Sequence, residues 1–306
     1  MGLVLDGAVV TRTGDPVGYG AYRGLLRARR DLHVLAKAVA PSPAGTDELA
    51  PFNYLARRHF SLAIAPGFLP GISRAARKFP NLKFAVLDST RGQLGTRAPN
   101  VEGTVFHVEQ AAYLAGYLAA RMTDRGPRTH VVSSVGGFPT PPVRAFIAGF
   151  RAGARRADPR IKLLNAYTDD FITRAKCAHA ALQQIAQGSR VVFDVAGACG
   201  LGALSAAKRK GVYGVGVDSD QSFLGKFILT SVVKNQDAAV FDLARRLVQG
   251  RLRTGGNLSF DLRNHGVQLG KFSPDVPRTL RRQLRRLAAA IEQGRISVPA
   301  TLHRSH

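Results

Sequence analysis

Cysteine is scarce in this sequence, and long apolar runs are missing from it. The two cysteines, Cys177 and Cys199, have no histidine or further cysteine at metal-ligand spacing, so we expect no metal site. We expect Cys177 in a helix and Cys199 in a turn, as a free pair without a structural role. A disulfide is the alternative, and it requires the fold to bring the two thiols together. No run of about eighteen apolar residues occurs, so no transmembrane helix is expected.

An export signal is also missing from the first residues, MGLVLDG, which enter a strand pattern directly. They lack the basic, apolar and cleavage regions of a signal peptide. The chain is then either cytoplasmic or the mature part of a longer precursor. We expect the second, because the sequence starts so close to a strand that carries a functional residue.

Acidic residues are few, with 20 against 44 lysines and arginines, which gives a net charge of +24. Such a charge normally indicates a nucleic-acid partner. Here the basic residues are spread over most predicted helices, and no basic stretch is interleaved with stacking aromatics, so we expect no nucleic acid. The densest group, around Leu280, Leu284 and Leu287, is typical of the solvated face of an amphipathic helix, with contact to anionic lipid or a partner as the alternative. Its members are Arg278, Arg281, Arg282, Arg285 and Arg286.

Short apolar runs alternate with helical patterns along the chain, which predicts parallel sheets covered on both faces. Strands are expected near 2–5, 32–39, 61–65, 83–88, 101–106, 129–135, 161–167, 190–196, 212–217 and 227–233. The pattern occurs twice, separated by a longer helix at 108–124, which predicts two similar α/β lobes. We expect residues 1–106 with about 236–270 in the N-terminal lobe, 107–235 in the C-terminal lobe, and 271–306 as a basic helix and tail. The crossings would lie near 105–108 and 225–235.

Residues 191–221 form one β-α-β unit with polar groups at its strand ends. An apolar strand leads to a glycine turn and a helix, and a second strand ends in Asp-Ser-Asp. In open parallel sheets, ligands bind outside the carboxyl ends of the strands. Gly197, Gly200, Asp218 and Asp220 are therefore expected to share one rim that holds a small polar molecule. These glycines do not form a GxGxxG motif, so a dinucleotide cofactor is not expected.

The sequence carries no catalytic signature. The eight histidines are scattered and none has nucleophile-base or metal-ligand spacing, and Gly-x-Ser-x-Gly and Walker motifs are missing. An enzyme on a Rossmann-like scaffold stays as an alternative, because triads assemble from distant positions. We expect no catalysis, no cofactor and no metal.

Several segments together resemble the basic membrane protein, or PnrA-like, family of substrate-binding lipoproteins of ABC importers. The segments are LVLDG, RAARKFPNLKFAVLD, NVEGTVFHVEQAAYLAGYLAA, PPVRAFIAGFRAGA, VAGACGLGALSAA, GVGVDSDQS and LTSVVKNQD. The resemblance covers nearly the whole chain. It implies a type I periplasmic-binding-protein fold, with two Rossmann-like lobes and a multi-strand hinge, that binds a nucleoside or similar polar molecule, most often a purine nucleoside. It also implies a membrane ABC permease as partner and an extracytoplasmic, membrane-anchored location.

The resemblance also implies a set of ligand-binding residues. Asp6 and Asp88 match positions that face the base and the cleft, Phe171 an aromatic that stacks on the base, and Gly197 a pocket wall. Asp218 and Lys234 match the groups that bind ribose hydroxyls. Each residue has a plainer interpretation: a cap or turn for Asp218, core packing for Phe171, close packing for the glycines, a surface position for Lys234 and loop polarity for Asp6 and Asp88.

The sequence departs from the family pattern after the first strand. The family shows Asp-x-x-Phe-Asn there, whereas Val17 and Gly18 follow Asp15-Pro16 here. The second aromatic face would then come from Tyr19, Tyr22 or Phe68, or the ligand is not a purine nucleoside. A cytoplasmic ligand sensor that uses the same fold is the alternative function.

Overall fold

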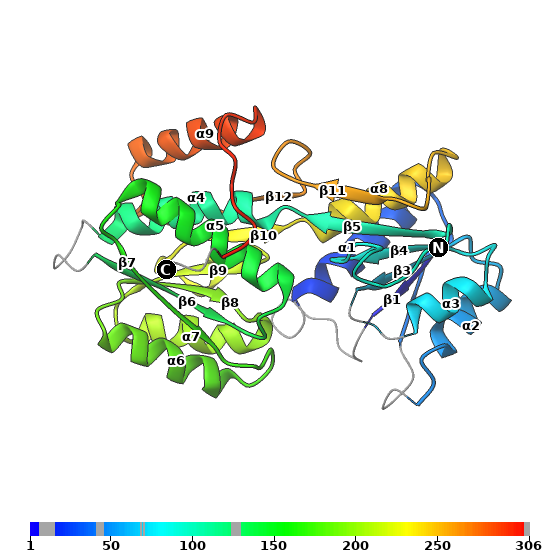
Figure 1. The fold of residues 1–306 in the computed structure, drawn as a ribbon, viewed down its shortest axis with the longest axis horizontal. Coiled ribbons are helices and arrows are strands. Elements are labelled where there is room, and N and C mark those ends of the chain that lie inside the picture. The colour runs from blue at the N-terminus through cyan, green and yellow to red at the C-terminus, as the bar shows by residue number, and fades with distance from the viewer. Residues whose placement is uncertain (6–15, 41–45, 68, 70, 124–129, 303–306) are drawn as a thin grey trace. The chain divides into compact units, whose positions relative to one another are not determined.

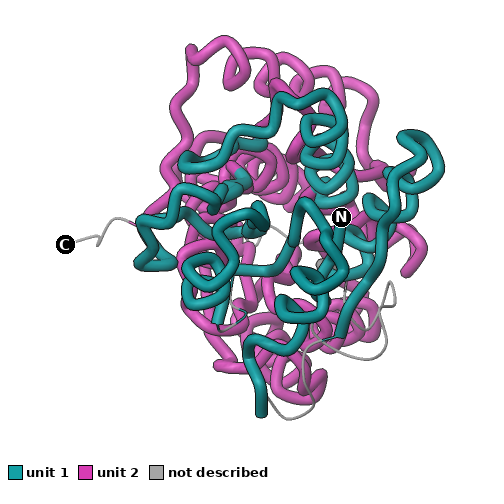
Figure 2. Tube along the Cα trace, turned by 90° about the vertical axis from the view of Figure 1, so that its right-hand side faces the viewer, with its two compact units in different colours: residues 1–106, 235–260 teal, residues 107–234, 261–306 magenta. Residues whose placement is uncertain are grey.

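A computed structural model describes residues 1–302 except 6–15, 41–45, 68, 70 and 124–129 (Figure 1). The chain forms two compact units, coloured separately in Figure 2. The first comprises Met1–Phe106 and Asn235–Phe260, and the second His107–Lys234 and Asp261–His306. The chain therefore passes between the units three times. Residues 261–270 group with the second unit, whereas the sequence pattern had placed them in the first.

The first unit is built on a six-stranded parallel sheet of order β11-β5-β4-β3-β1-β2. Its strands are β1 (Gly2–Val4), β2 (Lys37–Val39), β3 (Leu62–Pro66), β4 (Lys83–Leu87), β5 (Val101–Phe106) and β11 (Asn257–Phe260). Its helices are α1 (Pro16–Asp31), α2 (Ala50–Arg57), α3 (Ile72–Lys78) and α8 (Gln236–Val248). Leu3 and Ile64 pack with α1 and α8, while Val4 and Ala63 pack with α2 and α3. Successive strand residues point to opposite faces, which explains why these strands are apolar throughout.

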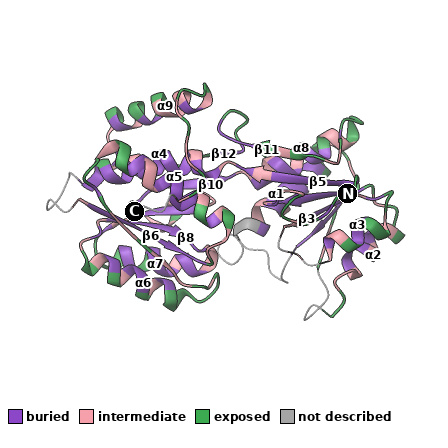
Figure 3. Ribbon diagram, in the orientation of Figure 1, coloured by how far each residue is buried: buried purple, intermediate pink, exposed green. Residues whose placement is uncertain are grey.

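The second unit repeats this plan with the order β12-β10-β9-β8-β6-β7, in which only β12 is antiparallel to its neighbour. Its strands are β6 (Val131–Gly136), β7 (Lys162–Tyr167), β8 (Val191–Val195), β9 (Tyr213–Asp218), β10 (Ile228–Lys234) and β12 (Val267–Leu269). Its helices are α4 (Val108–Thr123), α5 (Pro141–Ala157), α6 (Arg174–Ala186), α7 (Gly197–Arg209) and α9 (Arg278–Glu292), with a short 3-10 turn η2 at Ser222–Leu224. Helices α6 and α7 cover one face, and α4 and α5 the other (Figure 1). The buried strands of both sheets are visible in Figure 3.

Of the twelve strands in the described residues, ten occur where the apolar runs predict them, and the long helix predicted at 108–124 is confirmed as α4. The fold class is confirmed as two parallel-dominated α/β sheets. Strands β11 and β12 were missed, because they are short edge strands in a mostly polar stretch. Within the part of the chain that the structure describes, no helix is both long and apolar enough to cross a membrane.

The two units place an aspartate at the same point of their sheets. Leu62 pairs with Lys83 in the first sheet, and Val191 pairs with Tyr213 in the second. Asp88 follows Lys83 along β4 by the same number of residues as Asp218 follows Tyr213 along β9, so the two aspartates occupy equivalent positions. Their φ angles, 61° and 62°, are nearly identical, and aspartate is among the few non-glycine residues that adopt this left-handed conformation readily.

Candidate functional site

The carboxyl ends of β9 and β10 bring Asp218 and Lys234 together. Lys234 Nζ lies 3.4 Å from Asp218 Oδ1, and the side chains are 5% and 12% exposed. Two opposite charges that are both largely removed from water are retained only when they are paired and hydrogen-bonded. Lys234 is therefore not the surface lysine of the plainer interpretation, because its ammonium group is held inside the rim.

The sequence pattern predicts that Asp220 and the glycines of α7 line a ligand-binding rim, whereas the structure shows local interactions for them. The Asp220 carboxylate accepts hydrogen bonds from Ser222 N and Ser222 Oγ, both at 3.1 Å, which is a local turn interaction. No glycine turn precedes α7, since the helix begins at Gly197. Gly200 and Gly202 are buried in that helix and serve close packing.

A buried carboxyl group, Asp194, lies behind this rim and was not among the predicted site residues. Asp194 is in β8, is 0% exposed, and its Oδ1 accepts a hydrogen bond of 3.0 Å from Ala196 N. A Cβ atom at Gly200 would lie 1.5 Å from Asp194 Oδ1. Gly200 is thus the residue type that leaves room for this carboxyl group beneath α7.

The surroundings of Asp194 favour its neutral form. Its pKa is raised to about 8, mainly by burial and also by the nearby charge of Asp218, while hydrogen bonds from Ala196 N and from the Gln221 side chain act in the opposite direction. Asp194 Oδ2 and Gln221 Oε1 are both buried acceptors that lack a hydrogen-bond donor. Gln221 packs over Gly216, which the sheet register places beside Asp194. A proton on Asp194 Oδ2 would supply a donor between these two acceptor atoms.

Phe171 lies in the loop between β7 and α6 and is an exposed aromatic, not a core residue. It is 38% exposed, and Phe138, after β6, is 44% exposed. Their ring centroids are 5.4 Å apart in an edge-to-face arrangement. A Cβ atom at Gly137 would lie 2.3 Å from the Phe171 ring, so the ring lies directly on the backbone beyond β6. Phe138 was not predicted as a site residue.

Asp170 fixes the shape of the loop that carries Phe171. Its Oδ1 accepts hydrogen bonds from Ile172 N at 2.7 Å and Thr173 N at 2.8 Å, and its Oδ2 lies 3.0 Å from Lys176 Nζ. These interactions, the backbone donors first, lower the pKa of Asp170 far below its usual value. The loop is therefore held by a carboxylate that stays ionised at any physiological pH.

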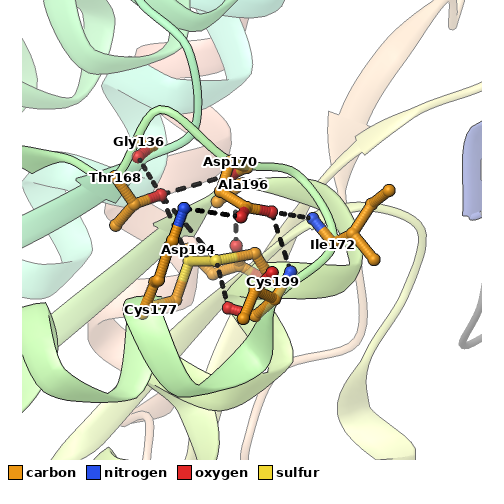
Figure 4. The surroundings of a disulfide bond; sticks show 10 residues. Gly136, Thr168, Asp170, Ile172, Cys177, Asp194, Ala196 and Cys199 are labelled. Atoms are coloured by element: carbon orange, nitrogen blue, oxygen red, sulfur yellow. Dashed lines mark hydrogen bonds and ion pairs between the residues drawn. A yellow bond between two sulfur atoms is a disulfide. The ribbon is translucent and has the colours of Figure 1, made fainter.

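A disulfide joins α6 to α7 next to this loop, so the prediction of a free cysteine pair was wrong. Cys177 in α6 and Cys199 in α7 form the bond, with a Cα–Cα distance of 5.6 Å (Figure 4). Cys199 N donates to Phe171 O at 3.0 Å. Cys199 is also in the first turn of α7 and not in a turn before it. The thiols are brought together because α6 and α7 pack side by side on one face of the sheet.

Gly197 lies next to Phe171, as the first residue of α7. Its φ is 56°, and a Cβ atom there would lie 3.4 Å from Phe171 O. A side chain at this position would strain the backbone, and its Cβ would touch the Phe171 loop at ordinary contact distance. Gly197 and Phe171 thus form one local group, and Asp218 with Lys234 a second, at the same end of the sheet of the second unit.

The remaining predicted residues belong to the first unit or are outside the described residues. Asp88 follows β4 and is half-buried. Asp6 and Phe68, like the side chain of Val17, fall outside the residues that the structure describes. Gly18 lies in α1, and Tyr22, in the same helix, is half-buried against the core that α1 shares with α8. Within the described part of the chain, no group of three or more potential metal ligands occurs.

Comparison with known proteins identifies the family. Residues 4–301 match the family described as PnrA-like ABC transporter substrate-binding proteins. The chain is 28% identical to the "ABC transporter nucleoside-binding protein BmpA" of Lactococcus lactis subsp. cremoris, over 85% of this chain and 77% of that one. It is 30% identical to an uncharacterized lipoprotein of Pyrococcus horikoshii, over 81% of this chain and 63% of that one.

Solved structures show the same fold. A solute-binding protein of an ABC transporter system from Aeropyrum pernix K1 superposes with a TM-score of 0.83 at 21% identity, over 99% of this chain and 94% of that one. This likeness, together with the two parallel-dominated sheets, shows the type I periplasmic-binding-protein fold that the sequence resemblance implied. The chain belongs to the PnrA-like family of ABC transporter substrate-binding proteins.

Proposed function

We propose that this protein binds a nucleoside, with a purine nucleoside favoured, and delivers it to an ABC permease in the membrane without transforming it. The observation that carries the proposal is the buried Asp218–Lys234 pair at the carboxyl ends of β9 and β10. A carboxylate accepts hydrogen bonds from two sugar hydroxyls, and an ammonium group donates to a sugar oxygen. A ligand without those hydroxyls would lack these charge-assisted hydrogen bonds, which makes such a pair selective.

The aromatic pair of Phe171 and Phe138 suits the base of a nucleoside. Phe171 is exposed at the same end of the sheet, and a phenyl face stacks on a base regardless of the polar groups at the base edge. In the proposed site, Phe171 and Gly197 contact the base, while Asp218 and Lys234 contact the ribose. Asp6 and Asp88 are the ligand-binding residues that the family resemblance implies for the first unit. The printed name of the Lactococcus relative describes nucleoside binding for that protein, which supports the same ligand class here.

We further propose an extracytoplasmic, membrane-anchored location. The Cys177–Cys199 disulfide supports it, because disulfides persist in oxidising compartments and are rare in the cytosol. The same bond disfavours the alternative of a cytoplasmic ligand sensor. The archaeal relative is named a lipoprotein, which agrees with anchoring.

Titration calorimetry of the purified protein tests the ligand class. We expect binding heat with adenosine, guanosine or inosine, weaker heat with uridine, and none with free adenine or ribose, since each contacts only half of the site. Absence of heat and of a thermal shift with all four nucleosides would overturn the ligand assignment while leaving the family membership intact.

A further inference from the structure

Helix α9 carries an arginine cluster that the proposed ligand site does not use. Arg278, Arg282, Arg285 and Arg286 are exposed, and we call these four side chains the arginine face. Arg281 differs from them, because its guanidinium group donates to the carbonyl groups of Ser273 and Val276 and so fixes the start of the helix.

The opposite side of α9 anchors the helix to the second unit. Leu280, Leu284 and Ile291 are buried, and α9 contacts α4. Figures 1 and 3 show the helix lying along the outside of this unit with exposed residues along its length. Apolar burial on one side holds the arginine face toward solvent as a fixed feature of the fold.

The stability of α9 does not explain the position of these charges. A helix is stabilised by acidic residues in its first turn and basic residues in its last turn. Basic residues occupy the last turn of α1, α2, α3, α4, α5, α7 and α8. Helix α9 has the reverse arrangement, because it starts with arginines, has neither an acidic first turn nor a basic last turn, and ends at Glu292.

The positive charges of the arginine face lie close together and are not neutralised by ion pairs with described residues. The spacings 278–282 and 282–286 put like charges one turn apart, which destabilises a helix. No member of the face forms an ion pair with any residue in the described ranges. A surface that costs helix stability and finds no partner within its own unit is suited to an anionic partner outside the molecule.

We propose that the arginine face of α9 docks on the anionic surface of a lipid bilayer. The arginine face extends from Arg278 to Arg286, so it presents a line of positive charge about 12 Å long, and headgroup phosphates accept paired N–H donors from arginine. The helix contains no aromatic residue, so it offers no stacking surface for nucleic-acid bases. The choice of a membrane rests in part on the proposed location beside a permease.

Vesicle cosedimentation tests this docking. Wild-type protein is expected to bind phosphatidylcholine vesicles that contain phosphatidylglycerol, to ignore pure phosphatidylcholine, and to dissociate as salt screens the attraction. The variant R278Q/R282Q/R285Q/R286Q should bind at least about tenfold less. The matched control R29Q/R57Q/R77Q/R209Q removes the same charge from exposed sites on other helices and should lose less than about twofold, since only a contacting face contributes fully.

Three outcomes would overturn the proposal. The first is that the wild type does not bind phosphatidylglycerol vesicles. The second is that both variants lose binding equally, which would indicate diffuse attraction. The third is that the arginine face binds duplex DNA or RNA more tightly than vesicles. Circular dichroism confirms that both variants fold, and the α9 variant should melt no lower than wild type because repulsion is relieved. Nucleoside calorimetry on the α9 variant keeps this proposal separate, because its heat should equal that of wild type.

Discussion

Lys234 and Asp218 form an ion pair across the ends of two adjacent strands, with Nζ and Oδ1 3.4 Å apart and both side chains largely buried. Asp218 reaches this position through a left-handed backbone conformation at the end of β9, with φ of 62°. Asp88 repeats that conformation in the first unit. The pair is therefore held by two adjacent interior strands of the sheet, which is the kind of support that a selective binding site needs.

Replacement of Asp218 by Ala should abolish most of the nucleoside affinity. The loss of a charged hydrogen-bond partner for the ribose is expected to weaken binding by roughly 2–4 kcal/mol, measured by calorimetry. The protein should also be less stable, because the buried charge of Lys234 would lose the carboxylate of Asp218 that compensates it.

The double variant D218N/K234M separates these two effects. It removes both charges while keeping similar volumes, so the midpoint of thermal unfolding should recover relative to D218A. Affinity for the nucleoside should not recover. If D218A bound every nucleoside like wild type, the pocket would lie elsewhere.

Asp194 should make the stability of the protein decrease as pH rises through the neutral range. Its pKa is about 8 in the folded state, whereas an unfolded aspartate titrates near 3.9. Between these two values the folded state holds one more proton than the unfolded state, so the free energy of unfolding falls as pH rises. The contribution of Asp194 is fully present below about pH 4 and is lost by about pH 8.

The variant Asp194→Asn tests this assignment. The amide keeps the acceptor for Ala196 N and supplies a permanent donor toward Gln221. At pH 8 the variant should therefore be more stable than wild type, by roughly 1–3 kcal/mol, and the difference should vanish near pH 4. Denaturant unfolding at a series of pH values measures the stability difference at pH 8 and its disappearance near pH 4. Identical pH profiles for the two proteins would show that Asp194 is ionised in the folded state.

The sequence predicted strands wherever the residues form an apolar run, which includes the edge strands β2 and β7 as well as the strands buried on both faces. It could not predict β11 and β12, whose residues NLSF and VQL form edge strands and carry no such signal. The end of the first unit at Phe260 was likewise misplaced, since β11 and β12 follow each other closely but belong to different sheets.

For the candidate site, the sequence located residues at strand ends but not those that depend on packing. Asp194 lies within VVFDV, which looks like core, and a charged residue in such a run was the available signal. Its role depends on Gly200, a contact that only the packing of α7 on β8 creates. The disulfide depends in the same way on the packing of α6 against α7.

Gly200→Ala should destabilise the protein, although alanine is the better helix former. The added methyl group would overlap Asp194 Oδ1, and relief would require α7 to move away from β8. We expect a loss of more than about 2 kcal/mol in the free energy of unfolding. In the double variant D194A/G200A the loss should be smaller than the sum of the single losses, because the clash has been removed. Gly92→Ala, where the nearest atom is 3.8 Å from the added carbon, is the control and should be close to neutral.

Removal of the Cys177–Cys199 disulfide should weaken both stability and ligand binding. The bond closes a segment of 22 residues, for which the chain-entropy relation gives about 3 kcal/mol of stabilisation. It also fixes Cys199, whose N–H donates to Phe171 O, so the Phe171 loop should sample more conformations without it and bind the base less tightly. The variant C177S/C199S should therefore show a lower unfolding midpoint and a weaker Kd for nucleosides, and reducing agent should reproduce both effects in wild type but not in the variant. If C177S/C199S lowered the unfolding midpoint but left the Kd unchanged, the disulfide would not influence the binding loop. A bond that only stabilises the fold leaves the position of Phe171 unaltered.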